Sequence, residues 1–386
     1  MTVDLDDVAF ERGSYVLVRD ALRTTDRVRV IGRHPDLQGT LAAWCRVTGH
    51  GYESGTVVRL SGRDRFVGAL ASGAVDPRMA DGVAQQADNR WGLAARGALI
   101  EDGEAELQFP LTDKHVVWDD DAPRLYAQAV AAQWDPNTAV PWDAEFSLPA
   151  QVEQAVVQVM TYLVENETAA LLVPARFIGM VHPHFREVVA LLAVTVADEA
   201  RHVEVFTRRA ALKGTCIGTS SRGGQASLAT LVREPDFSMA TFLLSVLGEA
   251  SFLELLHFLR DFGPDPVTRT VAKLAAQDEA RHVAFAVGHL RRQAAADPSL
   301  RDRLGSAIRG RNDALRETSG LNDDVFDALV VLASDGWTPT GVAVGFDRVV
   351  ALVARMDRSR RAHLVRLGFT DAEAAGLSAL HTRNFM

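Results

Sequence analysis

The hexapeptide Asp-Glu-Ala-Arg-His-Val occurs twice in the chain, at residues 198–203 and 278–283. Each copy lies deep inside a long stretch with helical spacing of apolar residues, and each follows another stretch of the same kind. Residues three apart share a helix face, so Glu199 lies beside His202, and Glu279 beside His282. A single Glu-x-x-His pair is typical of a solvent-facing helix. Two identical copies in matching contexts instead predict a helical bundle whose centre binds metal ions.

The helix before each copy is expected to add one carboxylate at the same height. In the second hairpin, Glu249 and Glu279 are each 15 residues from Pro264, which marks the turn. Equal distance from the turn means equal height in an antiparallel pair of helices. Glu254 lies five residues nearer to the turn, about 7 Å off that level. The sequence therefore predicts Glu249 as the ligand.

The same count applies to the first hairpin. Glu167 and Glu199 are each 16 residues from Pro183, and Glu167 shares a helix face with apolar residues. We therefore predict Glu167 as the fourth carboxylate, with Glu165 as the alternative.

The predicted cluster contains four carboxylates and two imidazoles. Four negative charges balance two divalent ions, so the site is tolerable in a water-poor interior. Carboxylate and imidazole ligands suit iron or manganese rather than a thiolate-seeking metal. Asp198 and Asp278 each stand four residues before a histidine, where they are expected to hold an imidazole N–H group. The six predicted ligands are Glu167, Glu199, His202, Glu249, Glu279 and His282.

The pattern of a Glu followed by Glu-x-x-His, twice over, resembles the ferritin-like di-iron carboxylate oxygenases and oxidases across residues 147–292. The resemblance implies a mainly α fold, with a ferritin-like four-helix bundle that holds two iron ions, or manganese at one or both positions. It also implies O2 as co-substrate and hydroxylation, desaturation or N-oxygenation of a small or carrier-linked organic substrate. Amine N-oxygenases of this group have a further histidine one turn before the last Glu, where this chain has Ala275. The reaction type therefore stays open.

A second class of function uses the same ligands. A ferritin-like protein that oxidises or stores iron, or that detoxifies peroxide, needs no organic substrate. Iron-storage chains of the superfamily are little more than the bundle, whereas this chain adds about 240 residues that could shape a substrate pocket. The length favours the oxygenase.

The predicted organisation has four parts. Within the bundle, the first helix starts near Ser147 and ends or kinks at Pro174, and the second opens at Pro183. The third helix runs from Ser238 to Phe262, and shorter helices follow the fourth. The parts are residues 1–75, a small α/β domain with a strand at 56–60; 76–146, a connecting or covering region; 147–292, the bundle; and 293–386, a C-terminal helical extension.

Residues 27–52 resemble the second half of the small TusA-like sulfur-carrier fold, and the similarity extends over about residues 8–62. That family carries its reactive cysteine in a Cys-Pro-x-Pro turn before the first helix. The corresponding stretch here, residues 11–15, has neither cysteine nor proline. We expect this domain to dock a partner or cover the bundle, with a packing appendage as the alternative.

Composition narrows the partners. The chain has 41 Lys and Arg against 50 Asp and Glu, a net charge of −9, which disfavours nucleic acid and anionic membranes. Two cysteines, Cys45 and Cys216, without metal or redox spacing fit a reducing cytoplasm, and the acidic N-terminus lacks a secretory pattern. We expect an electron-donor protein as a partner, and a homodimer is possible. The apolar run 241–259 contains Glu249, Glu254 and His257, so a buried bundle helix is expected there rather than a membrane span.

Overall fold

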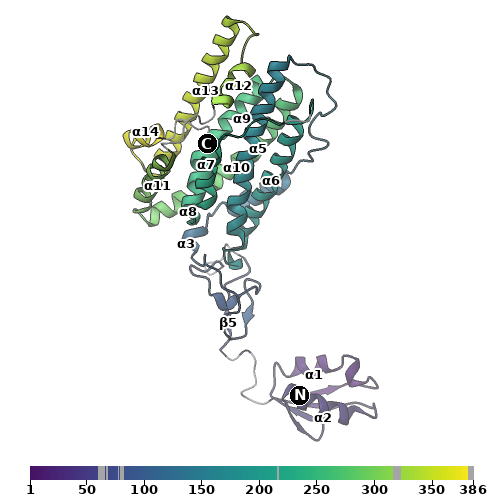
Figure 1. The fold of residues 1–386 in the computed structure, drawn as a ribbon. Helices are drawn as coiled ribbons and strands as arrows, with labels where there is room; N and C mark the ends of the chain where they lie inside the picture. Colours follow the sequence, from purple (N-terminus) through teal and green to yellow (C-terminus); the bar gives the residue numbers. More distant parts are fainter. Residues whose placement is uncertain are drawn as a thin grey trace. The chain divides into compact units, whose positions relative to one another are not determined.

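The computed structural model describes residues 1–59, 66, 68–76, 78, 82–214, 217–315 and 323–380. Cys216 and the last residue of the strand predicted at 56–60 lie outside this part. The chain divides into two compact units, residues 1–76 with 94–106, and residues 77–93 with 107–386 (Figure 1).

The first unit is a small α/β fold. Its elements are β1 (Thr2–Asp4), α1 (Tyr15–Ala21), β2 (Arg27–Ile31), α2 (Leu37–Thr48), β3 (Gly51–Glu53) and β4 (Thr56–Val58). The sheet order is β1-β2-β4-β3, with β1 and β2 parallel and the other pairs antiparallel. Alternation along β2 buries Val28 and Val30 in the same core as Leu41 and Cys45 of α2. A short hairpin of β5 (Leu70–Ala71) and β6 (Leu99–Ile100) belongs to the same unit.

The second unit is built on four long helical segments, which confirms the mainly α fold class. They are α5 (Ala150–Ile178), α6 (Arg186–Ala210), the continuous run α8 (Phe237–Thr241), η4 (Phe242–Glu249) and α9 (Ala250–Phe262), and α10 (Pro266–Ala296). Helix α5 packs along α6, α9 packs along α10, and α6 also contacts α10. Figure 1 shows these helices side by side.

Local sequence explains where these helices begin. The Asp265 side chain accepts a hydrogen bond from the Thr268 N–H group, and Pro266 occupies the first turn of α10. The sequence predicted that the first helix ends or kinks at Pro174. Helix α5 instead continues past Pro174 to Ile178. Pro174 is buried, so tertiary packing holds this turn despite the missing N–H donor.

The run before Glu249 differs from the uniform helix that the sequence predicted. Segment η4 is a π-helix of eight residues, all buried, joined to an α-helix on either side. Wider π turns often accompany functional sites because they change which side chains face the interior. In the described part of the chain, the helix Phe237–Phe262 is the one long and apolar enough to span a membrane, yet 83% of its most apolar window is buried in the fold.

Smaller helices surround the bundle. Helix α4 (Ala122–Ala131) packs against α6, α12 (Asp323–Leu332) against α5, and α13 (Pro339–Arg366) against α9. Helix α13 has 28 residues, so the C-terminal extension is not made of short helices alone. Their bounds are α3 (Lys114–Val117), α4 (Ala122–Ala131), α7 (Arg222–Arg233), α11 (Leu300–Leu315), α12 (Asp323–Leu332), α13 (Pro339–Arg366) and α14 (Asp371–Ala379).

Candidate metal centre

Two overlapping groups of acidic and imidazole side chains lie at the centre of the bundle. Glu167, Glu199, His202 and Glu279 form one group, and Glu199, Glu249, Glu279 and His282 form the other. Within each group the potential ligand atoms lie within 4.8 Å of one another. Glu199 and Glu279 belong to both groups, which is the arrangement needed for carboxylates that bridge two metal ions.

All six side chains are at most 5% exposed. Within the described residues, both carboxylate oxygens of Glu249 and of Glu279 have no hydrogen-bond partner, and neither does one oxygen each of Glu167 and Glu199. Buried carboxylate oxygens without a hydrogen-bond donor are costly, so several of them converging on one point are a donor set suited to a cation. The residues therefore fit a pair of divalent ions, with two histidines and four glutamates as donors.

Both histidines direct the Nδ1 atom into this cluster. His202 Nδ1 lies 3.2 Å from Glu199 Oε2 and 3.4 Å from Glu279 Oε1. His282 Nδ1 lies 3.0 Å from Glu199 Oε1 and 3.4 Å from Glu279 Oε2. The Nε2 atom of each ring points away, so Nδ1 is the nitrogen available to a metal ion.

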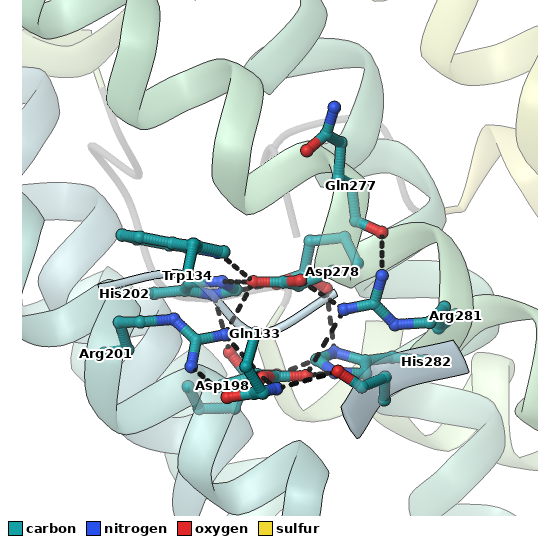
Figure 2. Close-up of polar contacts among 12 residues, drawn as sticks. Gln133, Trp134, Asp198, Arg201, His202, Gln277, Asp278, Arg281 and His282 are labelled. Carbon is teal, nitrogen blue, oxygen red and sulfur yellow. Dashed lines mark hydrogen bonds and ion pairs between the residues drawn. The ribbon is translucent and has the colours of Figure 1, made fainter. Parts of the chain in front are cut away.

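The outward nitrogens contact aspartates of the opposite motif copy. His202 Nε2 lies 3.2 Å from Asp278 Oδ2, and His282 Nε2 lies 3.4 Å from Asp198 Oδ2 (Figure 2). The sequence predicted imidazole partners for both aspartates, but the contacts cross from one helix to the other rather than staying within one motif. Because Nε2–H donates to a carboxylate, the tautomer with a free Nδ1 lone pair is favoured.

Arginines and residues of the connecting region also contact Asp198 and Asp278 (Figure 2). Arg201 bonds Asp198 at 2.5 Å and Asp278 at 2.9 Å. Trp134 Nε1 donates to Asp278 Oδ2 at 2.8 Å, and the Arg201 guanidinium lies 4.6 Å from the centre of the Trp134 ring.

Asp198 and Asp278 each have a further contact. Gln133 Nε2 donates to Asp198 Oδ1 at 2.8 Å, and Arg281 pairs with Asp278. Sequence reasoning missed Gln133 and Trp134. The four tryptophans between residues 91 and 142 were the available signal.

Charge crowding shifts the pKa values of the cluster. Burial, and then the charges of Glu199 and Glu279, raise the pKa of Glu167 well above its usual range. Burial and the charge of Glu279 do the same to the pKa of Glu249. For His202, burial opposes the charged form, but the neighbouring Glu167, Asp278 and Glu199 outweigh it and raise the pKa. These shifts express the same excess of negative charge that a cation would neutralise.

The alternatives named from the sequence lie elsewhere. Glu165 is half-buried and belongs to neither group. Glu254 of α9 forms an ion pair with Arg355 of α13 at 3.5 Å and belongs to neither group. Ala275, at the position of the further histidine, is fully buried and offers no ligand atom. The choice of ligands stays a prediction, and the grouping supports Glu167 over Glu165.

Residues 150–309 match the family model described as p-aminobenzoate N-oxygenase AurF. This segment contains all six residues of the cluster.

Residues 150–309 therefore belong to the ferritin-like di-iron carboxylate superfamily. This confirms the resemblance drawn from the two motif copies, and it makes the chain a di-iron enzyme of the oxygenase or oxidase type that activates oxygen. No curated protein matches the chain.

Solved structures of R2-like ligand-binding oxidases are also similar to this chain. A variant with a reconstituted Mn/Fe cofactor is 17% identical, with 66% of this chain and 95% of that chain covered and a TM-score of 0.48. The oxidase from Sulfolobus acidocaldarius is 15% identical, with 66% and 94% covered and a TM-score of 0.48. A variant with a reconstituted Fe/Fe cofactor is 15% identical, with 64% and 94% covered and a TM-score of 0.45.

Proposed function

We propose that this protein uses two iron ions and O2 to oxidise a small organic molecule by hydroxylation, desaturation or N-oxygenation. The ions would be held by Glu167, Glu199, His202, Glu249, Glu279 and His282. The observation that carries the proposal is the pair of four-residue groups that share Glu199 and Glu279 at the centre of the bundle. The match to an N-oxygenase family model supports the oxygenase class.

An apolar cleft beside the cluster supports an organic substrate over iron storage. Its wall includes Phe177, Phe237 and Phe285 together with Glu249 and His282. The cleft itself has a volume of only about 30 Å³, so an organic molecule enters it only when the side chains of its wall move apart. The path by which iron enters a storage protein is expected to be lined by polar groups that bind hydrated cations. Apolar walls instead suit an organic molecule.

When bound by these residues, two iron ions would supply the electrons and the Lewis acidity that activate O2. The chain's own groups orient the ligands and exclude water. Asp198 and Asp278 orient the two imidazole rings, and the burial of the six ligands, each at most 5% exposed, limits the access of water. Because oxygenation of an organic molecule consumes further electrons, we expect an electron-donor protein, and we place the reaction in the cytoplasm.

Metal analysis tests the site. Protein purified without chelators and loaded anaerobically with Fe(II) is expected to bind two ions per chain. Glu199→Ala and Glu279→Ala should each lower the stoichiometry to one or none, because both residues belong to both groups. The matched controls Glu165→Ala and Glu254→Ala should retain two ions. Two tightly bound ions in the Glu199→Ala and Glu279→Ala variants would contradict the proposed ligands.

Oxygen use tests the reaction. The loaded protein, mixed with O2 and an electron donor, should consume O2 faster when its substrate is present. Mass spectrometry with ¹⁸O2 separates the three reaction types, because hydroxylation and N-oxygenation incorporate label and desaturation does not. Iron oxidation that deposits many ions per chain, with no organic product from a broad substrate panel, would instead identify an iron-storage protein.

A further inference from the structure

The cleft beside the cluster differs from one built to hold an acid. Its lining residues are apolar except for three hydroxyl side chains, those of Thr195, Thr241 and Ser245, and the cluster residues Glu249 and His282. None of these lining residues, all within the described part of the chain, is lysine or arginine. A carboxylate in this cleft would therefore meet no cationic side chain on the wall.

A basic residue behind the wall is already engaged. The Arg176 guanidinium lies 4.5 Å from the centre of the Phe177 ring, on α5. Two of its nitrogens donate to the backbone carbonyls of Val232 and Glu234. If the Arg176 side chain turned toward the cleft, both carbonyls would lose these donors. Arg176 is therefore not available to bind an anionic substrate.

The charge of the cluster leads to the same result. Four carboxylates and two divalent ions sum to zero, so a bound carboxylate would leave one uncompensated negative charge in a buried site. Glu249, which itself lines the cleft, would stand close to that charge. A neutral molecule incurs neither cost and gains contact with the aromatic walls formed by Phe177 and Phe237, whose rings meet edge to face at 5.1 Å.

We infer that the substrate is an uncharged, largely apolar molecule, and that the hydroxyl groups of Thr195, Thr241 and Ser245 form hydrogen bonds with its polar atoms. This inference rests on the proposed function. It separates this chain from the activity that the matching family model is named for, because p-aminobenzoate carries a carboxylate.

The test compares p-aminobenzoate with its methyl ester. Both have the same ring and amine, and only the acid is charged at neutral pH. Calorimetric titration of the anaerobic Fe(II)-loaded protein should show the ester binding at least about tenfold more tightly than the acid. Equal or tighter binding of the acid, or millimolar or weaker binding of both compounds, would overturn the inference.

A variant with a larger side chain in the cleft tests whether the substrate binds there. Thr195 is half-buried on α6, so Thr195→Phe should occupy the cleft and lower the affinity for the ester at least about tenfold. Ala193→Phe, at an exposed position of the same helix, is the matched control and should bind the ester like the unmodified protein. Unchanged ester binding by Thr195→Phe would rule out this cleft. If that variant fails to fold, the comparison of acid and ester on the unmodified protein still decides the charge preference.

The same samples separate the two proposals. Iron content and O2 consumption are measured on each preparation before titration. Two bound ions with a preference for the acid would reject the substrate class and leave the di-iron proposal standing. Absence of bound iron would reject the proposed function itself.

Discussion

The Nε2 atom of His202 lies 3.2 Å from the Oδ2 atom of Asp278, which belongs to the other copy of the repeated motif. Asp198 approaches His282 in the reciprocal way at 3.4 Å. Each half of the predicted metal site is thus oriented by an aspartate from the opposite hairpin. The two hairpins must therefore be docked before either imidazole is fixed for metal binding.

Removing one of these aspartates should weaken metal binding without removing a ligand. We expect Asp278→Ala to lower the affinity for one of the two ions by about 10–100-fold, because the His202 ring loses the acceptor that sets its tautomer and orientation. Anaerobic Fe(II) titration measures this change. Asp261→Ala, which breaks an exposed ion pair with Arg260, is the control and should leave both affinities unchanged. Unaltered affinity in Asp278→Ala would show that the contact plays no part in metal binding.

Trp134 should contribute to stability through its hydrogen bond to the buried Asp278 carboxylate. Trp134→Phe keeps an aromatic ring but leaves that acceptor one donor short, at a cost of about 1–3 kcal/mol in the free energy of unfolding. Urea denaturation measures the difference. Trp337→Phe is the control because Trp337 is 63% exposed, and it should change stability by less than about 0.5 kcal/mol. Similar losses in both variants would argue against a specific role of the indole N–H group.

Arg209 joins three segments of the bundle in its fully buried position. Its guanidinium pairs with Glu153 of α5 at 2.7 Å and with Asp265, the cap of α10, at 2.8 Å. Arg209→Met keeps most of the side-chain volume but leaves both acids unpaired, so we expect a loss of about 3–5 kcal/mol. The exposed Arg260 provides the comparison, because Arg260→Met should cost no more than about 1 kcal/mol. Chemical denaturation of both variants tests this ranking, and equal losses would contradict it.

Asp119 should make stability depend on pH. Burial raises the pKa of Asp119 from 3.8 to about 6, and one of its oxygens has no hydrogen-bond partner among the described residues. Between about pH 4 and 6 the folded chain holds a proton that the unfolded chain has released, so stability falls as pH rises through this window.

Asp119→Asn removes this titration. Relative to the unmodified protein, the variant should gain stability as pH rises from about 4 to 6 and keep that gain above pH 6. Denaturant midpoints measured across this range test the prediction. A constant difference between the two proteins at every pH would contradict it.

Much of the centre could be predicted from the chain because its rules are local. Spacing of three residues places Glu199 beside His202 in any helix, and equal counts from Pro183 and Pro264 bring Glu167 and Glu249 to the level of the motifs. The structure brings the same six side chains together. The mainly α fold and the superfamily followed from this pattern, whereas the substrate and the reaction type did not.

The sequence by itself determined which residue types lie on which helix face, since the period of the α-helix depends on the backbone alone. Tertiary structure decided the rest. The pairing of His202 with Asp278, the approach of Trp134 from a separate segment and the π-helical turns before Glu249 depend on how helices dock. Docking is set by the fit of many side chains distant in sequence, which no local spacing records.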